Sequence, residues 1–197
     1  MSRPIGSRRI QPPPGTDPVA GDGRRPDHVL DVAVVVESDA WQEIAGLEQA
    51  IVDAARRAFR AADAAPAGAR GVTVALLDDA EVRRLNGQFR SQDKPTNVLS
   101  FPVLATDVSS SAGTLLGDDL DDDAEQTIGD IALAYETVAR EAAEGRIAPI
   151  DHVRHLVVHG VLHLLGYDHE TDAEAERMEA LETHILTAMG IADPYAR

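Results

Sequence analysis

The segment from Pro149 to Leu165 restricts the possible folds of this chain more than any other. Apolar residues occupy most faces of the helix that it would form, so other elements must cover that helix on several sides. Its polar edge is made by His152, His155, His159 and His163. These histidines follow at steps of three, four and four, and each step is close to a whole helical turn. The sequence therefore predicts a buried central helix with one histidine edge.

Strand and helix patterns alternate along the rest of the chain. Strands are expected at 29–37, at 71–77, at 98–101 and at the start of the segment 128–145. Helices are expected at 41–62, after a cap at Asp78 or Asp79, over the rest of 128–145 up to Gly145, at 149–165 and at 172–189. This order predicts an α+β fold, a small mixed β-sheet of about four strands flanked by about five helices.

The length of 197 residues suits one domain with tails. Residues 29–190 form the expected domain, and 191–197 a C-terminal tail. Residues 1–28 are rich in Pro, Gly and Arg and are expected to be disordered, while 105–126 form an expected flexible acidic insertion. Apolar runs are too short to cross a bilayer and no signal core follows the first arginines, so a soluble, cytoplasmic protein is expected.

The formal net charge of −16 argues against unspecific binding of nucleic acid, because affinity for phosphate comes mainly from clustered Lys and Arg. The acidic residues concentrate in two segments, 118–125 and 170–182. One short segment is basic, with Arg83, Arg84, Arg90 and Lys94. A small basic patch on an acidic body is therefore expected.

Five of the seven histidines lie between His152 and His169. Two imidazoles four residues apart on a helix can bind one tetrahedral ion, and Gly166 allows the chain to turn and bring His169 back as a third ligand. Because the chain has no cysteine, nitrogen ligands are the ones available for zinc. Three protein ligands leave a coordination position open, which is typical of a catalytic zinc with an acidified water. We therefore expect one Zn²⁺ at His159, His163 and His169.

The spacing also resembles the long zinc-peptidase motif, in which a glutamate follows the first histidine as general base. Gly160 stands at that position here. Peptide hydrolysis is therefore the weaker alternative. A non-catalytic assembly factor with a zinc-stabilised core is a further alternative. Asp168 and Glu170 are candidates to orient an imidazole or to accept a proton.

The segment HGVLHLLGYDH, residues 159–169, resembles the signature of the bacterial YbeY metal-dependent endoribonucleases. The segments LNGQFRSQDKPTNVLSFP at 85–102 and GDIALA at 129–134 are similar to two further motifs of that family, and the resemblance spans about residues 29 to 190. Two departures are a longer head and acidic insertion, and Asn97, where the family also carries Asp.

The resemblance implies a zinc-dependent, single-strand-specific endoribonuclease that acts in maturation of the 16S ribosomal RNA 3′ end and in ribosome quality control. Arg90 matches the family's cleft arginine, and a guanidinium beside a metal can pair with a phosphate and stabilise developing charge. The catalytic set is then Arg90, His159, His163 and His169. The expected partners are single-stranded and ribosomal RNA, with small-subunit ribosomal proteins or an assembly GTPase as protein candidates, and no membrane or DNA.

Several nearby residues keep two interpretations. Lys94 would either contact a phosphate or simply be exposed. Five further residues would either take part in the site or have a local structural role: Thr96, Asn97, Ser100, Asp130 and Met178. His152 and His155 would either support the site or pack in the core. The general base is not assigned by the sequence.

Overall fold

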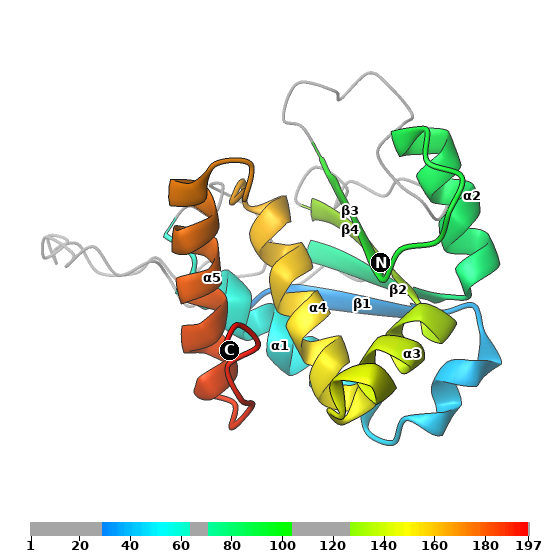
Figure 1. Ribbon diagram of the computed structural model, residues 1–197, viewed down its shortest axis with the longest axis horizontal. Coiled ribbons are helices and arrows are strands. Elements are labelled where there is room, and N and C mark those ends of the chain that lie inside the picture. The colour runs from blue at the N-terminus through cyan, green and yellow to red at the C-terminus, as the bar shows by residue number, and fades with distance from the viewer. Residues whose placement is uncertain (1–28, 64–70, 104–126, 197) are drawn as a thin grey trace, which may run out of the picture.

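The computed structural model describes residues 29–63, 71–103 and 127–196. The predicted tail at 1–28 and the predicted insertion at 105–126 lie outside these residues. Figure 1 shows helices around one sheet, in the predicted order. The elements are β1 (Asp31–Val36), a 3₁₀ turn η1 (Asp39–Glu43), α1 (Leu47–Ala61), β2 (Gly71–Leu77), α2 (Asp79–Arg90), β3 (Val98–Pro102), β4 (Thr127–Ala134), α3 (Tyr135–Gly145), α4 (Pro149–Leu164) and α5 (Asp172–Thr187).

The sheet is mixed and has the strand order β1-β2-β4-β3. β1, β2 and β4 run parallel, and β3 pairs antiparallel with β4 at one edge. Pro102 ends β3 opposite Gly129, where proline's missing N–H is tolerated at an edge. Gly129 has a φ of 138°, and a Cβ there would collide with the Phe101 carbonyl. The four strands and the surrounding helices confirm the predicted α+β fold.

The two faces of the sheet carry separate apolar clusters. The larger cluster joins the sheet to α1, α4 and α5, and the smaller one joins the other face to α2 through Val82 and Leu85. Successive side chains of β2 point to opposite faces of the sheet, so Leu76 lies in the larger cluster and Leu77 in the smaller. α2 and α4 therefore lie on opposite faces of the sheet.

The helix α4 is central, as its sequence predicts. It contacts α1, α3 and α5 as well as strands β3 and β4. Its apolar residues Val153, Val157, Val158, Val161 and Leu162 are fully buried. Pro149 occupies the first turn, where the absent N–H removes no helical hydrogen bond.

Two local features differ from the sequence prediction. The helix expected over 41–62 is split, because Gly46 adopts a φ of 73° between η1 and α1. α3 ends at Gly145, as predicted, and Arg146 directly after it adopts the left-handed region at φ 54°. The buried face of α5 includes Glu182 beside Met178 and Ile185. No helix in the three described segments is long and apolar enough to span a membrane.

Candidate metal centre

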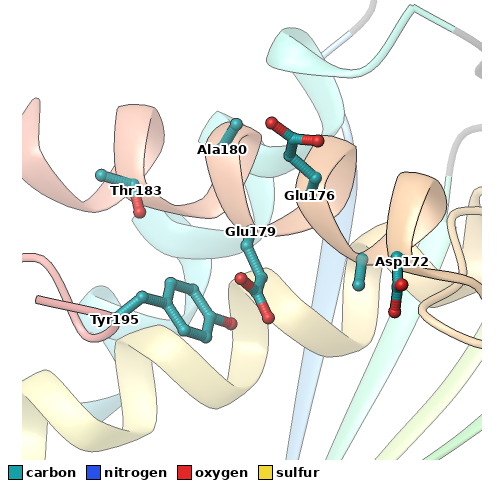
Figure 2. Close-up of a pocket in the computed structure, with 7 residues that line it drawn as sticks. Asp172, Glu176, Glu179, Ala180, Thr183 and Tyr195 are labelled. Carbon is teal, nitrogen blue, oxygen red and sulfur yellow. The ribbon is translucent and has the colours of Figure 1, made fainter. Parts of the chain in front are cut away.

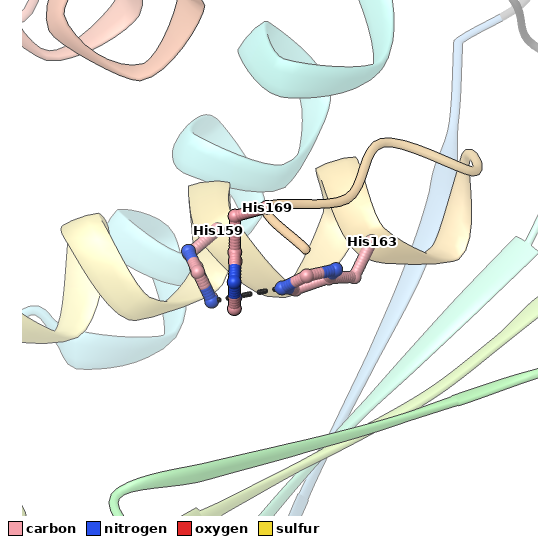
Figure 3. A group of neighbouring side chains, drawn as sticks. All are labelled: His159, His163 and His169. Atoms are coloured by element: carbon pink, nitrogen blue, oxygen red, sulfur yellow. Dashed lines mark hydrogen bonds between the residues drawn. The ribbon is translucent and has the colours of Figure 1, made fainter. Parts of the chain in front are cut away.

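One helical turn and a sharp reversal bring three histidines together. His159 and His163 lie one turn apart on α4. Gly166, with a φ of 86°, then reverses the chain, and Tyr167 N–H donates to the Leu162 carbonyl at 3.0 Å. This reversal places His169 over the first two rings, as Figure 3 shows.

The three imidazoles offer nitrogen atoms that all lie within 4.8 Å of one another. The Nε2 atoms of His159 and His163 are 3.0 Å apart. The His169 ring stacks on His159 with centroids 5.6 Å apart and lies edge-on to His163 at 4.9 Å. The structure thus assembles the three histidines that the sequence singles out.

The outer nitrogens of two rings are held by acceptors. His163 Nδ1 lies 3.0 Å from the Tyr167 carbonyl oxygen, which can only accept, so Nδ1 carries the proton. His159 Nδ1 lies 2.8 Å from Oε1 of Glu182 and donates to it in the same way. In the neutral rings both Nε2 atoms are therefore unprotonated, with lone pairs available as ligands.

The facing Nε2 atoms fit a cation. Two lone pairs 3.0 Å apart repel unless a proton or a metal ion lies between them. Burial, together with the neighbouring His159 and His169, lowers the pKa of His163, which disfavours a shared proton. Neutral imidazoles facing one point are the donor set that a divalent transition metal prefers.

Glu182 is the residue of this region that the sequence analysis missed. Its side chain has no solvent exposure and accepts hydrogen bonds from His155, His159 and Tyr195. Burial would raise the pKa of Glu182, but these three hydrogen bonds outweigh it and lower the pKa to about 2. The carboxylate is therefore ionised. One signal was available, since Glu182 lies on the apolar stripe of α5, four residues after Met178.

Tyr195 belongs to the segment 191–197, which the sequence analysis assigned to a tail. Its hydroxyl donates to Oε2 of Glu182, and its ring lies 6.0 Å edge-on from His155. Burial and the adjacent Glu182 raise the pKa of Tyr195, so its hydroxyl keeps the proton that it donates.

His152 lies two turns from the cluster and has different partners. Its Nε2 is 2.8 Å from Oε2 of Glu141, and the same oxygen accepts from Nδ2 of Asn97 at 2.9 Å. The buried Nδ1 of His152 has no hydrogen-bond partner among the described residues. The pair joins α3 and α4 to the start of β3, and Asn97 also caps that strand by accepting from Val98 N–H.

The basic segment is largely paired with acids. Arg83 forms an ion pair with Asp93, and Arg84 forms one with Glu81, both at 2.6 Å. Arg90, at the end of α2, and Lys94 are exposed and form no ion pair within the described residues. The expected basic patch is therefore reduced to these two cations.

Arg90 is not in contact with the histidines, because α2 and α4 cover different faces of the sheet. Packing contacts through β3 nevertheless link the end of α2, which carries Arg90, to α4, which carries His159 and His163. The preceding Phe89 packs edge-on against Phe101 of β3, with centroids 5.1 Å apart. β3 is the edge strand beside α4, where a Cβ on Gly160 would lie 3.2 Å from Ser100 Oγ.

Gly160 faces the sheet, not the three histidines. A Cβ at this position would lie 2.9 Å from Cδ1 of the fully buried Ile131. A glutamate here, as in the peptidase motif, would have no room and no access to the rings. The packing therefore argues against a peptidase.

The remaining candidates have local roles in the structure. Asp168 is exposed and accepts from His169 N–H at 2.8 Å, which steadies the loop of the third histidine. Glu170 is exposed, Met178 and Asp130 are buried, and Thr96 donates to the side chain of Asn97 at 3.5 Å.

Comparison with known proteins places this chain in a family. The model of the family described as Endoribonuclease YbeY matches residues 35–190. A Bradyrhizobium sp. protein named Endoribonuclease YbeY is 50% identical over 83% of this chain and 90% of its own length. A Rhodopseudomonas palustris protein of the same name is 49% identical, covering 83% of this chain and 80% of its own length.

One solved structure is also similar. The solution structure of TM1509 from Thermotoga maritima matches with a TM-score of 0.44 and 23% sequence identity, over 84% of this chain and 99% of that chain. The family assignment depends on the sequence matches, which extend over most of the chain, and all three histidines lie within the residues 35–190 that the family model matches. The chain therefore belongs to the YbeY endoribonuclease family.

Proposed function

We propose that this protein is a zinc-dependent endoribonuclease that cuts single-stranded RNA at the centre formed by His159, His163 and His169. Membership of the YbeY family makes it a hydrolase that acts on RNA. The observation that carries the proposal is the pair of unprotonated Nε2 atoms 3.0 Å apart, with a third imidazole beside them.

The three histidines would hold the ion, and the open side of the cluster would admit substrate. A divalent metal there supplies an acidified water and polarises a phosphoryl oxygen. Zinc suits the site best, because the donor set is three neutral imidazoles without thiolate or carboxylate. Tyr167 and Glu182 keep the lone pairs of two ligands directed inward.

Arg90 is the proposed phosphate-binding residue. Its guanidinium is exposed and has no carboxylate partner among the described residues, unlike Arg83 and Arg84. An unpaired guanidinium can bind a phosphate through two parallel hydrogen bonds and offset charge that develops during cleavage. Lys94, four residues further on, would add a second phosphate contact.

The biological substrate that we propose is ribosomal RNA, cut during maturation of the 16S 3′ end in the cytoplasm. The acidic surface supports selectivity for one RNA substrate, because a protein with a net charge of −16 gains little general affinity for phosphate from the rest of its surface. Small-subunit ribosomal proteins or an assembly GTPase would then position the RNA.

The test combines metal analysis with cleavage. Purified protein is incubated with an unstructured RNA, with a duplex RNA and with casein, each with and without a chelator. We expect about one zinc per chain and cleavage of the unstructured RNA alone, abolished by chelation and restored by zinc. Retention of nuclease activity in the metal-free protein would refute the proposal.

Two variants separate catalysis from binding. His163→Ala should lose both the zinc and the cleavage. Arg90→Ala should keep the zinc and the fold but lower kcat by about 100-fold, because it removes one charge-stabilising group. Full RNA cleavage by Arg90→Ala would show that Arg90 is not catalytic, whereas a zinc-loaded parent protein that cleaves no RNA would point to a non-catalytic assembly factor.

A further inference from the structure

We infer that Glu182 is a positioning residue of the metal centre, which sets the orientation and basicity of His159 through a hydrogen bond to its outer nitrogen. The inference rests on the proposed metal centre. It concerns a residue on α5 that does not belong to the histidine motif. The observation that carries it is a fully buried carboxylate 2.8 Å from His159 Nδ1.

The burial of an ionised carboxylate requires compensating contacts. An ionised group without solvent is strongly disfavoured unless hydrogen bonds and opposite charges compensate it. The neighbours of Glu182 along the stripe, Met178 and Ile185, are apolar and buried, and an apolar residue at 182 would pack with them. Polar chemistry directed at α4 accounts for the glutamate better than packing does.

The two carboxylate oxygens have separate partners. Oε2 lies 3.3 Å from His155 Nε2 and also accepts from the Tyr195 hydroxyl. Oε1 is left for His159. Contacts on both sides of the carboxylate fix its rotation, so Oε1 holds the His159 ring with Nε2 directed at His163. A carboxylate behind a ligating imidazole raises the basicity of the ligand as well as orienting it.

The exposed side of the Tyr195 ring is not an RNA-binding surface. Figure 2 shows its ring at a hollow along α5, beside Glu179. The acids Asp172, Glu176 and Glu179 line this hollow, and their charge would repel a phosphate backbone. The hydroxyl of Tyr195 therefore serves the carboxylate inside the protein.

The chain contains a matched control for Glu182. Glu141 also accepts from a histidine of α4, at the same 2.8 Å, but that histidine is His152, which is not among the three clustered rings. Glu141→Gln and Glu182→Gln make the same chemical change next to the same helix. Only the second change lies behind a proposed ligand.

The experiment measures the zinc dissociation constant of the full-length protein by competition with a chromophoric chelator. The absorption spectrum of the cobalt-substituted protein and unfolding of the metal-free protein in urea are recorded in parallel. We expect Glu182→Gln to bind zinc about 10- to 100-fold more weakly and to shift the cobalt bands, while Glu141→Gln changes neither.

A second variant separates metal tuning from structural support. Glu182→Met fills a similar volume, and the polar partners that it releases, on His155, His159 and Tyr195, are partly exposed and can bind water. We expect metal-free Glu182→Met to resist urea at least as well as the parent while it loses zinc affinity like Glu182→Gln. This variant also decides the question if Glu182→Gln fails to fold.

Three results would overturn the inference. One is zinc affinity within about twofold of the parent in both Glu182 variants, and a second is an equal loss in Glu141→Gln. Neither of these two results would contradict the proposed metal centre. The third is a parent protein that binds no zinc, and this result alone would also overturn the proposed metal centre.

Discussion

The two ends of α4 carry similar pairs with different consequences. At the N-terminal end His152 donates to Glu141, and at the C-terminal end His159 donates to Glu182, each over 2.8 Å. The pairs differ on the far side of the ring. The second nitrogen of His152 is buried without a partner among the described residues, whereas that of His159 faces His163 at 3.0 Å.

The glutamates differ as well. The side chain of Glu141 is 34% exposed, whereas that of Glu182 is fully buried. A histidine with a carboxylate behind it is thus not enough to define a metal ligand. A second inward-facing lone pair is also needed, and only the C-terminal end provides one. Each of the following predictions tests this difference.

The largest effect is expected from exchanging one histidine at each end. His159→Gln should weaken zinc binding by more than about 100-fold, since it removes a ligand rather than a supporting group. His152→Gln should keep about one zinc per chain. Metal content after dialysis measures both. A loss of zinc in His152→Gln would show that the two ends are not distinct.

Gly160, directly after His159 at the C-terminal end of α4, should tolerate no side chain that restores the peptidase motif. Gly160→Glu should lower the free energy of unfolding by about 3 kcal/mol or more, because the new carboxylate meets Ile131 in the core. Urea unfolding provides the measurement. A stable Gly160→Glu protein that cleaves casein would contradict both the packing and the proposed function.

Glu182 should make the free energy of unfolding of the metal-free protein depend on pH. Its pKa falls from 4.5 to about 2 on folding, so its stabilising contribution is complete above about pH 4.5 and is lost as the pH falls through about 2. The shift corresponds to about 3 kcal/mol between the ionised and the protonated form of Glu182, not to the difference between Glu182 and another side chain. This difference in pH dependence should appear between the parent and Glu182→Gln, measured by urea unfolding at a series of pH values.

If the two proteins lose stability in parallel over this range, Glu182 is not the ionised group that its contacts indicate. Glu141→Gln again provides the comparison from the other end of α4.

A smaller effect is expected at the turn that closes the C-terminal end. Gly166 has a φ of 86° with open space around it, so Gly166→Ala is strained in its backbone alone. We expect a loss of about 1 kcal/mol in stability. Zinc affinity should fall slightly, because the turn positions both the Tyr167 carbonyl and His169. Calorimetry and chelator competition would measure the two effects, and an unchanged melting temperature would contradict the first.

The sequence was sufficient for the elements and for the histidine cluster, because both depend on short-range spacing. Helical steps place His159 beside His163, and Gly166 is the residue expected where the chain must reverse. The same reasoning failed at residues 41–62, where the apolar period continues through Gly46 although the backbone there turns left-handed.

Spacing puts Glu182 on the apolar stripe of α5, but the partners of Glu182 and Tyr195 could not be predicted from it. Glu182 stands in a helix rich in acids, where a single buried glutamate looks like another solvated one until α4 is packed against it. Tyr195 follows the helix in an irregular segment, so nothing local shows that its hydroxyl reaches Glu182. Both contacts join residues of different elements, and tertiary packing decides them.

Because the chain is synthesised from its N-terminus, the contact between Glu182 and His159 can form only after all three histidines have been made. A nascent chain emerges from the ribosome N-terminal end first, so all three histidines are made before the carboxylate that supports His159. A chain that stops between His169 and Glu182 has the whole histidine motif but lacks the acceptor for His159 Nδ1. On the inference above, prematurely ended copies would therefore hold metal poorly.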